Sequence, residues 1–270
     1  MSQRGGRQPD PDPSLARALR AETLASPRLV AGLPGPGRWL LVEFAPVALF
    51  SLKTSQATSS VGRSLVVPTP YAIKMACVDA AFRAGWPDQD CEAFLESLIG
   101  VEVRIRPPGA AVVTHTIVKI RQEPKKSSPG EPYTSNIAYR EVVYHRGTWH
   151  WAFDLAAGDD LLAERLAGAL PRVRYIGKRG SFVQFLGLSR TERLGPEYTA
   201  AIDPTRSFEV PDAWQLQQLD DFGPEATFER LSSFSTARAE RGRHRVFATT
   251  IIPLGLTSAG PGFSEYRDRR

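Results

Sequence analysis

The chain has 270 residues, a hydrophobic fraction of 42% and a formal net charge of +5, with a sequence pI near 9.4. This length allows one large domain or two small ones, and the apolar content is enough to bury a core. The two cysteines, Cys77 and Cys91, are too few for a disulfide framework or a cysteine zinc site. No apolar stretch is long enough to span a bilayer and no secretory signal is present, so we expect no membrane partner and a cytoplasmic location.

The first part of the chain is predicted to be a leader, a strand and two helices. Residues 1–38 are rich in arginine, proline and glycine and are predicted to be a flexible leader. The apolar run 38–52 predicts a buried strand, and a long polar loop follows it. A helix is then predicted, with Thr69 as its N-cap, and a second, shorter helix with Asp90 as its cap.

Alternating apolar residues predict most of the remaining elements. Residues 101–106 read as a short strand, and the two longer runs 111–122 and 136–146 flank a polar tip, which together predict a long β-hairpin. Strands are also predicted within 148–155, 172–188 and 243–256, and a helix within 158–171 that begins near Asp159. The residues after Ser258 are predicted to be loose.

This order of elements predicts the fold class. Strand, helix, strands, helix, strand is the order of an α+β sandwich of the ferredoxin-like or RRM-like type, in which helices cover one face of an antiparallel sheet. The open face of such a sheet commonly binds RNA. We expect four parts, namely a leader over 1–38, a ferredoxin-like domain over 39–190, a β-rich C-terminal part over 191–258 and a tail over 259–270.

The charges are segregated along the chain. Four segments, 45–78, 103–122, 171–191 and 241–264, contain no aspartate or glutamate, whereas carboxylates are concentrated in 192–229. A single segment of this kind is most often a solvated face. Four of them, near glycines and hydroxyls at the junctions of strands and loops, favour binding of phosphates, because lysine, arginine, hydroxyl and backbone N–H groups are the usual phosphate ligands.

Two stretches resemble a known family. The first is FAPVALFSLKTSQATSSVGRSLVVPTPYAIKMACVDAAF (residues 44–82), and the second is LLAERLAGALPRVRYIGKRGSF (residues 161–182). The first stretch has a strand, a polar loop and Pro-Thr-Pro before an alanine-rich helix. The second has a leucine-rich helix, a proline and an aromatic-x-Gly-basic turn. Together they resemble the Cas five subunit of type I CRISPR surveillance complexes (Cascade), a branch of the RAMP superfamily. Lys74-Met75-Ala76 stands where that family usually has a Gly-Leu-Leu type run.

The resemblance implies a RAMP fold and a role. Such a subunit caps the 5′ handle of the CRISPR RNA and joins the large subunit to the backbone-forming RAMP subunits, without a cofactor. A long hairpin, the thumb, wedges beside the first guide nucleotides, and by position and length it corresponds here to about 112–146. The partners implied are CRISPR RNA and these Cascade subunits, and target DNA is left open as a further partner.

Candidate RNA contacts follow from the charge pattern and the resemblance together. They comprise cations, one glycine, a hydroxyl and aromatic rings of the acid-free segments and the hairpin tip: Lys53, Arg63, Lys74, Arg104, His115, Lys119, Lys125, Lys126, Tyr175, Gly177, Lys178, Arg179 and Ser181. The alternative interpretation of each lysine is a solvent-facing side chain without a ligand. The alternative interpretation of Tyr175 is a core tyrosine beside a tight turn.

Two other functions stay open. One branch of the family cleaves precursor RNA without a metal, using tyrosine, lysine and histidine, and Tyr71, Lys119 and His115 would have to meet at one phosphate to do so. His145 and His150 lack a third ligand, so we expect no metal site. The third hypothesis is a protein-interaction scaffold that binds through the acidic part of the chain and contacts no RNA.

Overall fold

The computed structural model describes residues 38–54, 61–122, 134–155, 159–203, 205, 210, 214–232 and 235–268. The predicted leader up to residue 37 and the hairpin tip with Lys125 and Lys126 therefore lie outside the described residues. None of the helices in these ranges is long and apolar enough to cross a membrane.

One sheet has four antiparallel strands in the order β3-β6-β1-β7. Its strands are β1 (Trp39–Pro46), β3 (Val103–Arg106), β6 (Trp149–Asp154) and β7 (Val183–Thr191). Alternate side chains face the core, as the sequence pattern predicts, and Leu40, Val42 and Phe44 of β1 are fully buried. The predicted common face of Trp149, Trp151 and Phe153 in β6 is confirmed, because all three side chains are buried.

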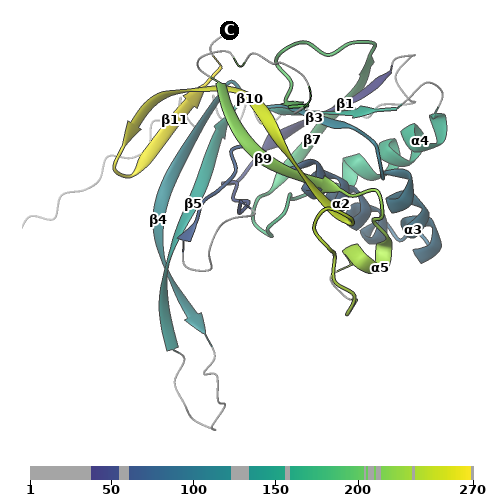
Figure 1. Ribbon diagram of the computed structural model, residues 1–270, viewed down its shortest axis with the longest axis horizontal. Coiled ribbons are helices and arrows are strands. Elements are labelled where there is room, and N and C mark those ends of the chain that lie inside the picture. The colour runs from purple at the N-terminus through teal and green to yellow at the C-terminus, as the bar shows by residue number, and fades with distance from the viewer. Residues whose placement is uncertain are drawn as a thin grey trace, which may run out of the picture.

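Helices pack on this sheet and complete its core (Figure 1). They are α2 (Pro70–Arg83), α3 (Asp88–Ser97), α4 (Asp160–Ala169) and the 3₁₀ turn η1 (Leu170–Arg172). Thr69 is the N-cap of α2, as predicted, and its Oγ1 accepts a hydrogen bond from the N–H of Ala72 at 3.1 Å. The predicted cap Asp90 is wrong, because α3 begins at Asp88, after Pro87, and has no side-chain cap.

The second sheet has seven strands and includes the long hairpin. Its strands are β2 (Val61–Gly62), β4 (Ala110–Gln122), β5 (Thr134–Arg146), β8 (Ala200–Ala201), β9 (Trp214–Phe222), β10 (Arg245–Gly260) and β11 (Phe263–Arg267), and α5 (Phe228–Leu231) follows β9. The main path runs β2-β5-β4-β11-β10-β8, and β9 also pairs with β10. The loose tail predicted after Ser258 is wrong, since β11 pairs with β4 from Phe263↔Thr114 to Arg267↔Ala110.

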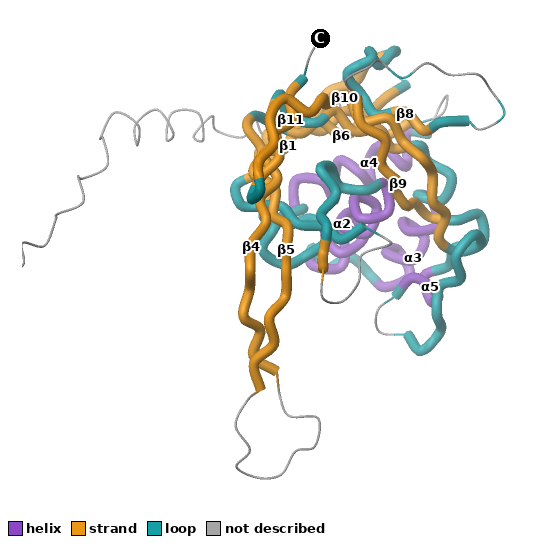
Figure 2. Tube along the Cα trace, turned by 60° about the vertical axis from the view of Figure 1, so that its left-hand side comes forward, coloured by secondary structure: helices purple, strands orange, loops and turns teal. Residues whose placement is uncertain are grey.

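The hairpin of β4 and β5 extends away from the rest of the molecule (Figures 1 and 2). Its strands pair from Ala110↔Arg146 out to Gln122↔Thr134. At its base Val113 and Val143 are buried, whereas farther out Ile117 is 63% exposed. The base therefore belongs to the core, and the outer part lies in solvent.

Candidate nucleic-acid interface

Three segments that are far apart in sequence meet at the base of the hairpin. They are the loop after β1, strand β5 and the turn before β7. The N–H of Phe50 donates to Val143 O at 2.9 Å, and the N–H of Val143 donates back to Phe50 O at 2.7 Å. The N–H of Ser51 donates to Ser181 Oγ at 3.2 Å, and its hydroxyl donates to Glu141 O at 3.0 Å. We call this meeting point the junction.

The turn at 175–182 has a defined backbone that presents cations to solvent. Ile176 N–H donates to Ser181 O at 3.1 Å, and Ser181 N–H donates to Lys178 O at 3.2 Å. Gly177 has φ +67°, in the left-handed region, and a Cβ there would lie 2.9 Å from Leu52 Cδ1. Glycine thus lets the turn approach the loop closely, and Lys178 and Arg179 remain exposed beyond it.

Positive side chains gather at the junction. Burial lowers the pKa of Lys178 from its ordinary value, and the nearby charges of Arg140 and Lys53 lower it further. The backbones at Lys53 and Ser64 form an isolated antiparallel β-bridge, which brings the chain at Lys53 beside the chain at Arg63. Lys53, Arg140 and Lys178 belong to three sequence-distant segments, and they are close enough for their charges to interact. Within the described residues, no carboxylate lies within ion-pair distance of Lys178.

Two residues of the junction were not among the predicted RNA contacts. Arg140 escapes the charge pattern because Glu141 follows it and the segment is not acid-free, although neighbouring side chains of a strand point to opposite faces. The side chain of Phe182 is 50% exposed, and its backbone forms an isolated antiparallel β-bridge with that of Tyr175. An aromatic residue directly after a glycine-rich basic turn was the available signal for it.

Two predicted RNA contacts are wrong. Lys74 is fully buried, and its Nζ lies 2.7 Å from Asp221 Oδ1, because α2 packs its lysine face against β9 rather than against solvent. Ser181 is 4% exposed, and its hydroxyl accepts the N–H of Ser51, so it joins the turn to the loop rather than facing outward.

The other candidates are spread over the molecule. Arg104 lies on β3 in the other sheet, pairs with Glu102 at 2.7 Å and stacks over Trp39, so the structure does not bring it to the junction. Lys119 is exposed opposite Ile137, farther out on the hairpin. Lys125 and Lys126 lie outside the described residues.

Tyr175 and His115 already have partners. Arg83 lies over the ring of Tyr175, 5.5 Å from its centroid, so one face of that ring is occupied. His115 lies on the hairpin with its Nδ1 3.6 Å from Glu141 Oε1. Stacking by Tyr175 and RNA contact by His115 stay predictions.

Two of the residues considered for RNA cleavage lie apart on β4, and the third packs against residues of β9 and β10. His115 and Lys119 share one face of β4 but are four residues apart, roughly 13 Å by the rise of a strand. Tyr71, on α2, packs edge-on against Phe222 and lies under Arg245. In the described parts of the chain there is also no group of three or more histidine, cysteine or acidic side chains that would hold a metal ion.

Comparison with known proteins shows a similarity in sequence to a CRISPR-associated protein. No family model matches the chain. Over 205 aligned residues the chain is 22% identical to the CRISPR-associated protein Cas5 of Archaeoglobus fulgidus, and the alignment covers 73% of this chain and 86% of that protein.

Two solved structures resemble the fold more distantly. The crystal structure of a CRISPR protein from Archaeoglobus fulgidus has a TM-score of 0.41 and 11% identity, over 86% of this chain and 92% of that one. A chain of a CRISPR RNA-guided surveillance complex has a TM-score of 0.39 and 14% identity, over 83% and 94%. By sequence, the resemblance to the Cas five subunits that two short stretches indicated is confirmed, and it extends over 73% of the chain.

Proposed function

We propose that this chain is a non-catalytic RNA-binding subunit of a CRISPR effector complex, which holds the 5′ handle of the CRISPR RNA at the junction and joins the large subunit to the backbone-forming subunits. One observation carries the proposal, namely that hydrogen bonds of Ser51 join the three separate segments that contain Lys53, Arg140 and Lys178. The charges of Lys53 and Arg140 are close enough to act on Lys178. Such a concentration of positive charge attracts a phosphate backbone, which dominates the affinity of proteins for nucleic acids.

We further propose that the four-stranded sheet with α2 and α4 is the ferredoxin-like RAMP unit, and that β4 and β5 form the thumb. The strand order β3-β6-β1-β7 and the chain order β1, α2, β3, β6, α4, β7 support this, because they follow a β-α-β-β-α-β pattern with the hairpin inserted between β3 and β6. The junction lies where this unit meets the hairpin, so a bound handle would contact both.

Binding rather than cleavage is favoured by the distance between His115 and Lys119 along β4 and by the packing of Tyr71 against Phe222 and Arg245. General acid–base catalysis requires its groups within hydrogen-bond reach of one phosphate. Incubating the pure protein with repeat RNA in EDTA tests this part of the proposal. Intact RNA is the expected result, and products with cyclic-phosphate ends would overturn it.

The binding site is tested by charge reversal with a matched control. We expect Lys178→Glu with Arg179→Glu to weaken binding of a short labelled single-stranded RNA strongly, and to lower the slope of log affinity against log salt by about 0.7 for every phosphate that the variant no longer neutralises. Arg193→Glu with Arg238→Glu makes the same change in net charge at exposed positions, beyond the far end of β7 and beside α5. Fluorescence anisotropy at several salt concentrations measures both.

The control separates a local site from a general charge effect. If both double variants bind RNA with equally reduced affinity, net charge rather than the junction governs binding, and the site assignment fails. Purifying the effector complex and asking whether discrete small RNA copurifies distinguishes RNA binding from a scaffold role without RNA.

A further inference from the structure

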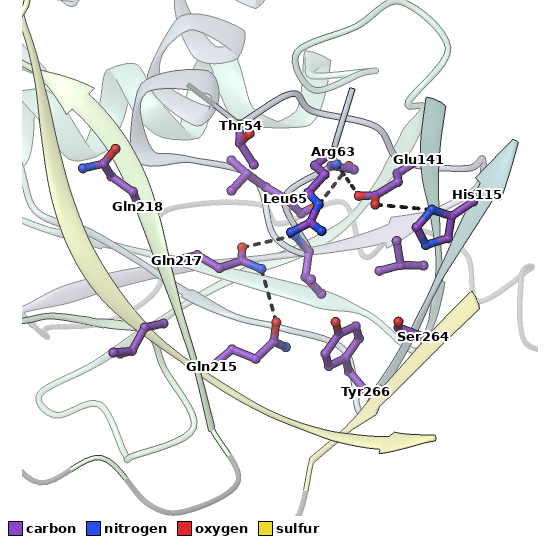
Figure 3. Close-up of a pocket in the computed structure, with 14 residues that line it drawn as sticks. Thr54, Arg63, Leu65, His115, Glu141, Gln215, Gln217, Gln218, Ser264 and Tyr266 are labelled. Atoms are coloured by element: carbon purple, nitrogen blue, oxygen red, sulfur yellow. Dashed lines mark hydrogen bonds and ion pairs between the residues drawn. The ribbon is translucent and has the colours of Figure 1, made fainter. Parts of the chain in front are cut away.

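A cavity of about 530 Å³ opens beside the junction, between the hairpin base, β9 and β11 (Figure 3). Arg63 and Thr54 line it from the loop, His115 and Glu141 from the hairpin, and Tyr266 from β11. Its size is within the range of small-ligand sites. Much of its lining is polar, and three glutamines of β9 belong to it: Gln215, Gln217 and Gln218.

A directed chain of hydrogen bonds fixes two of these amides. The N–H of Val66 donates to Gln217 Oε1 at 3.3 Å, Gln217 Nε2 donates to Gln215 Oε1 at 3.4 Å, and Gln215 Nε2 donates to Leu254 O at 3.4 Å. An amide has two N–H donors and two carbonyl lone pairs. Each glutamine therefore keeps one donor and one acceptor for a ligand, in an orientation set by the protein.

Glu141 makes the cavity unsuitable for a phosphate. Its Oε2 accepts the N–H of Ser64 at 2.7 Å, its Oε1 lies 3.6 Å from His115 Nδ1, and its side chain is only 13% exposed. A carboxylate repels a phosphate group but accepts hydrogen bonds from an amino group. The cavity thus has acceptors for an amino group, amide donors for a ring nitrogen, and the ring of Tyr266 on its wall.

We infer that this cavity holds one unstacked nucleobase in which an amino group adjoins a ring-nitrogen acceptor, adenine or cytosine, from the RNA strand bound at the junction. The inference rests on the proposed function. The backbones at Lys53 and Ser64 form an isolated β-bridge, and Ser64 lines the cavity, so the cavity opens directly beside the part of the junction that contains Lys53. This short separation allows one RNA strand to place a phosphate at the junction and a base in the cavity. Uracil would instead direct a carbonyl oxygen at Glu141.

The test compares two labelled ten-nucleotide RNAs, oligo(C) and oligo(U). Their bases differ in the group that would face the Glu141 carboxylate, which is an amino group in cytosine and a carbonyl group in uracil. With the full chain at one salt concentration, oligo(C) is expected to bind at least about 5-fold more tightly, the lower end of what one bidentate base contact contributes. Glu141→Gln removes the charge and adds a donor for the uracil carbonyl, so it should bring the ratio close to one. Glu164→Gln, at an exposed position of α4, removes the same charge and should leave the ratio unchanged.

A second variant protects the test against a folding defect. Gln217→Ala approaches the cavity from β9, and we expect it to weaken oligo(C) binding while oligo(U) binding changes little. The base site is wrong if both RNAs bind with equal affinity, or if neither cavity variant alters the ratio of the two affinities. The phosphate site at the junction would still stand, and a side chain of a protein partner would be the better occupant of the cavity. If neither RNA binds, the proposed function fails and this inference fails with it.

Discussion

Lys74 and Asp221 form an ion pair between α2 and β9 whose two members differ in exposure. The lysine side chain has no exposed surface, whereas the aspartate side chain is 30% exposed. Burial lowers the pKa of Lys74 and raises that of Asp221, while each charge partly offsets the effect on the other. The ring of Phe222 lies 5.3 Å from the ammonium group and adds a cation–π contact. The pair therefore serves the fold rather than a ligand.

We predict that removing either partner has an unequal effect on stability. Asp221→Ala leaves a buried ammonium group without a counter-charge and should lower the free energy of unfolding by about 3 kcal/mol or more. Lys74→Met fills the same space, and the remaining carboxylate can reach water, so its destabilisation should be clearly smaller. Urea unfolding at pH 7 measures both, and an equal or larger destabilisation for Lys74→Met would contradict the prediction. RNA affinity should not change in Lys74→Met, because this lysine is buried away from the junction.

His145 predicts a pH dependence of stability. The ring is buried, its Nε2 lies 2.7 Å from Val66 O, and burial lowers its pKa to about 4. Between pH 6.5, near the pKa of this histidine in the unfolded chain, and about pH 4, the unfolded chain binds a proton that the folded chain does not. The contribution of the neutral His145 to stability is therefore complete above pH 6.5 and declines as the pH falls. The decline should reach about 3 kcal/mol near pH 4.

The variant His145→Gln isolates this contribution. Its amide can still donate to Val66 O, but it does not titrate. Unfolding free energies of the two proteins, measured from pH 7 to pH 4, should therefore converge as the pH falls. Parallel curves would show that His145 does not titrate as its burial requires.

At the scale of elements, the hydrogen bond from the Ser51 N–H to Ser181 Oγ helps to join the loop after β1 to the turn before β7. Ser181→Ala removes the acceptor of the Ser51 N–H, and leaving this half-buried donor unpaired should cost about 1 kcal/mol of stability. Because the same turn carries Lys178 and Arg179, RNA affinity should fall as well. Ser97→Ala, which removes a local bond to Phe94 O on α3, is the control. If Ser181→Ala binds RNA as tightly as the control variant does, the hydrogen bond between Ser51 and Ser181 does not position Lys178 and Arg179.

Elements with a strong local signal were predictable from the sequence. The cap at Thr69, the alternation in β1 and β6 and the two strands of the hairpin agree with the pattern that predicted them. The prediction was wrong where pairing with a distant strand decides the structure. Residues 263–267 have no strong strand signal of their own, and they form β11 because β4 offers an edge.

At the scale of the whole molecule, reading charge along the chain found two of the three segments at the junction and missed the third. A search for segments without acidic residues ignores the fact that successive side chains of a strand point to opposite faces. It discarded Arg140 because of Glu141, whose side chain faces the other way, and it accepted Arg104 although Glu102, two residues earlier, shares its face and pairs with it. The cavity was unpredictable for a related reason, since its glutamines belong to β9, and only the sheet order places β9 near the hairpin.

The pairing of β11 with β4 has a consequence for biosynthesis. A ribosome releases β4 and β5 long before residues 263–267, on the order of ten seconds earlier at ordinary elongation rates. During that interval the nascent hairpin has an uncovered edge at its root, and the cavity lacks the wall that contains Tyr266. If the cavity selects a base as we infer, that selection can begin only after the segment with Tyr266 has paired with β4.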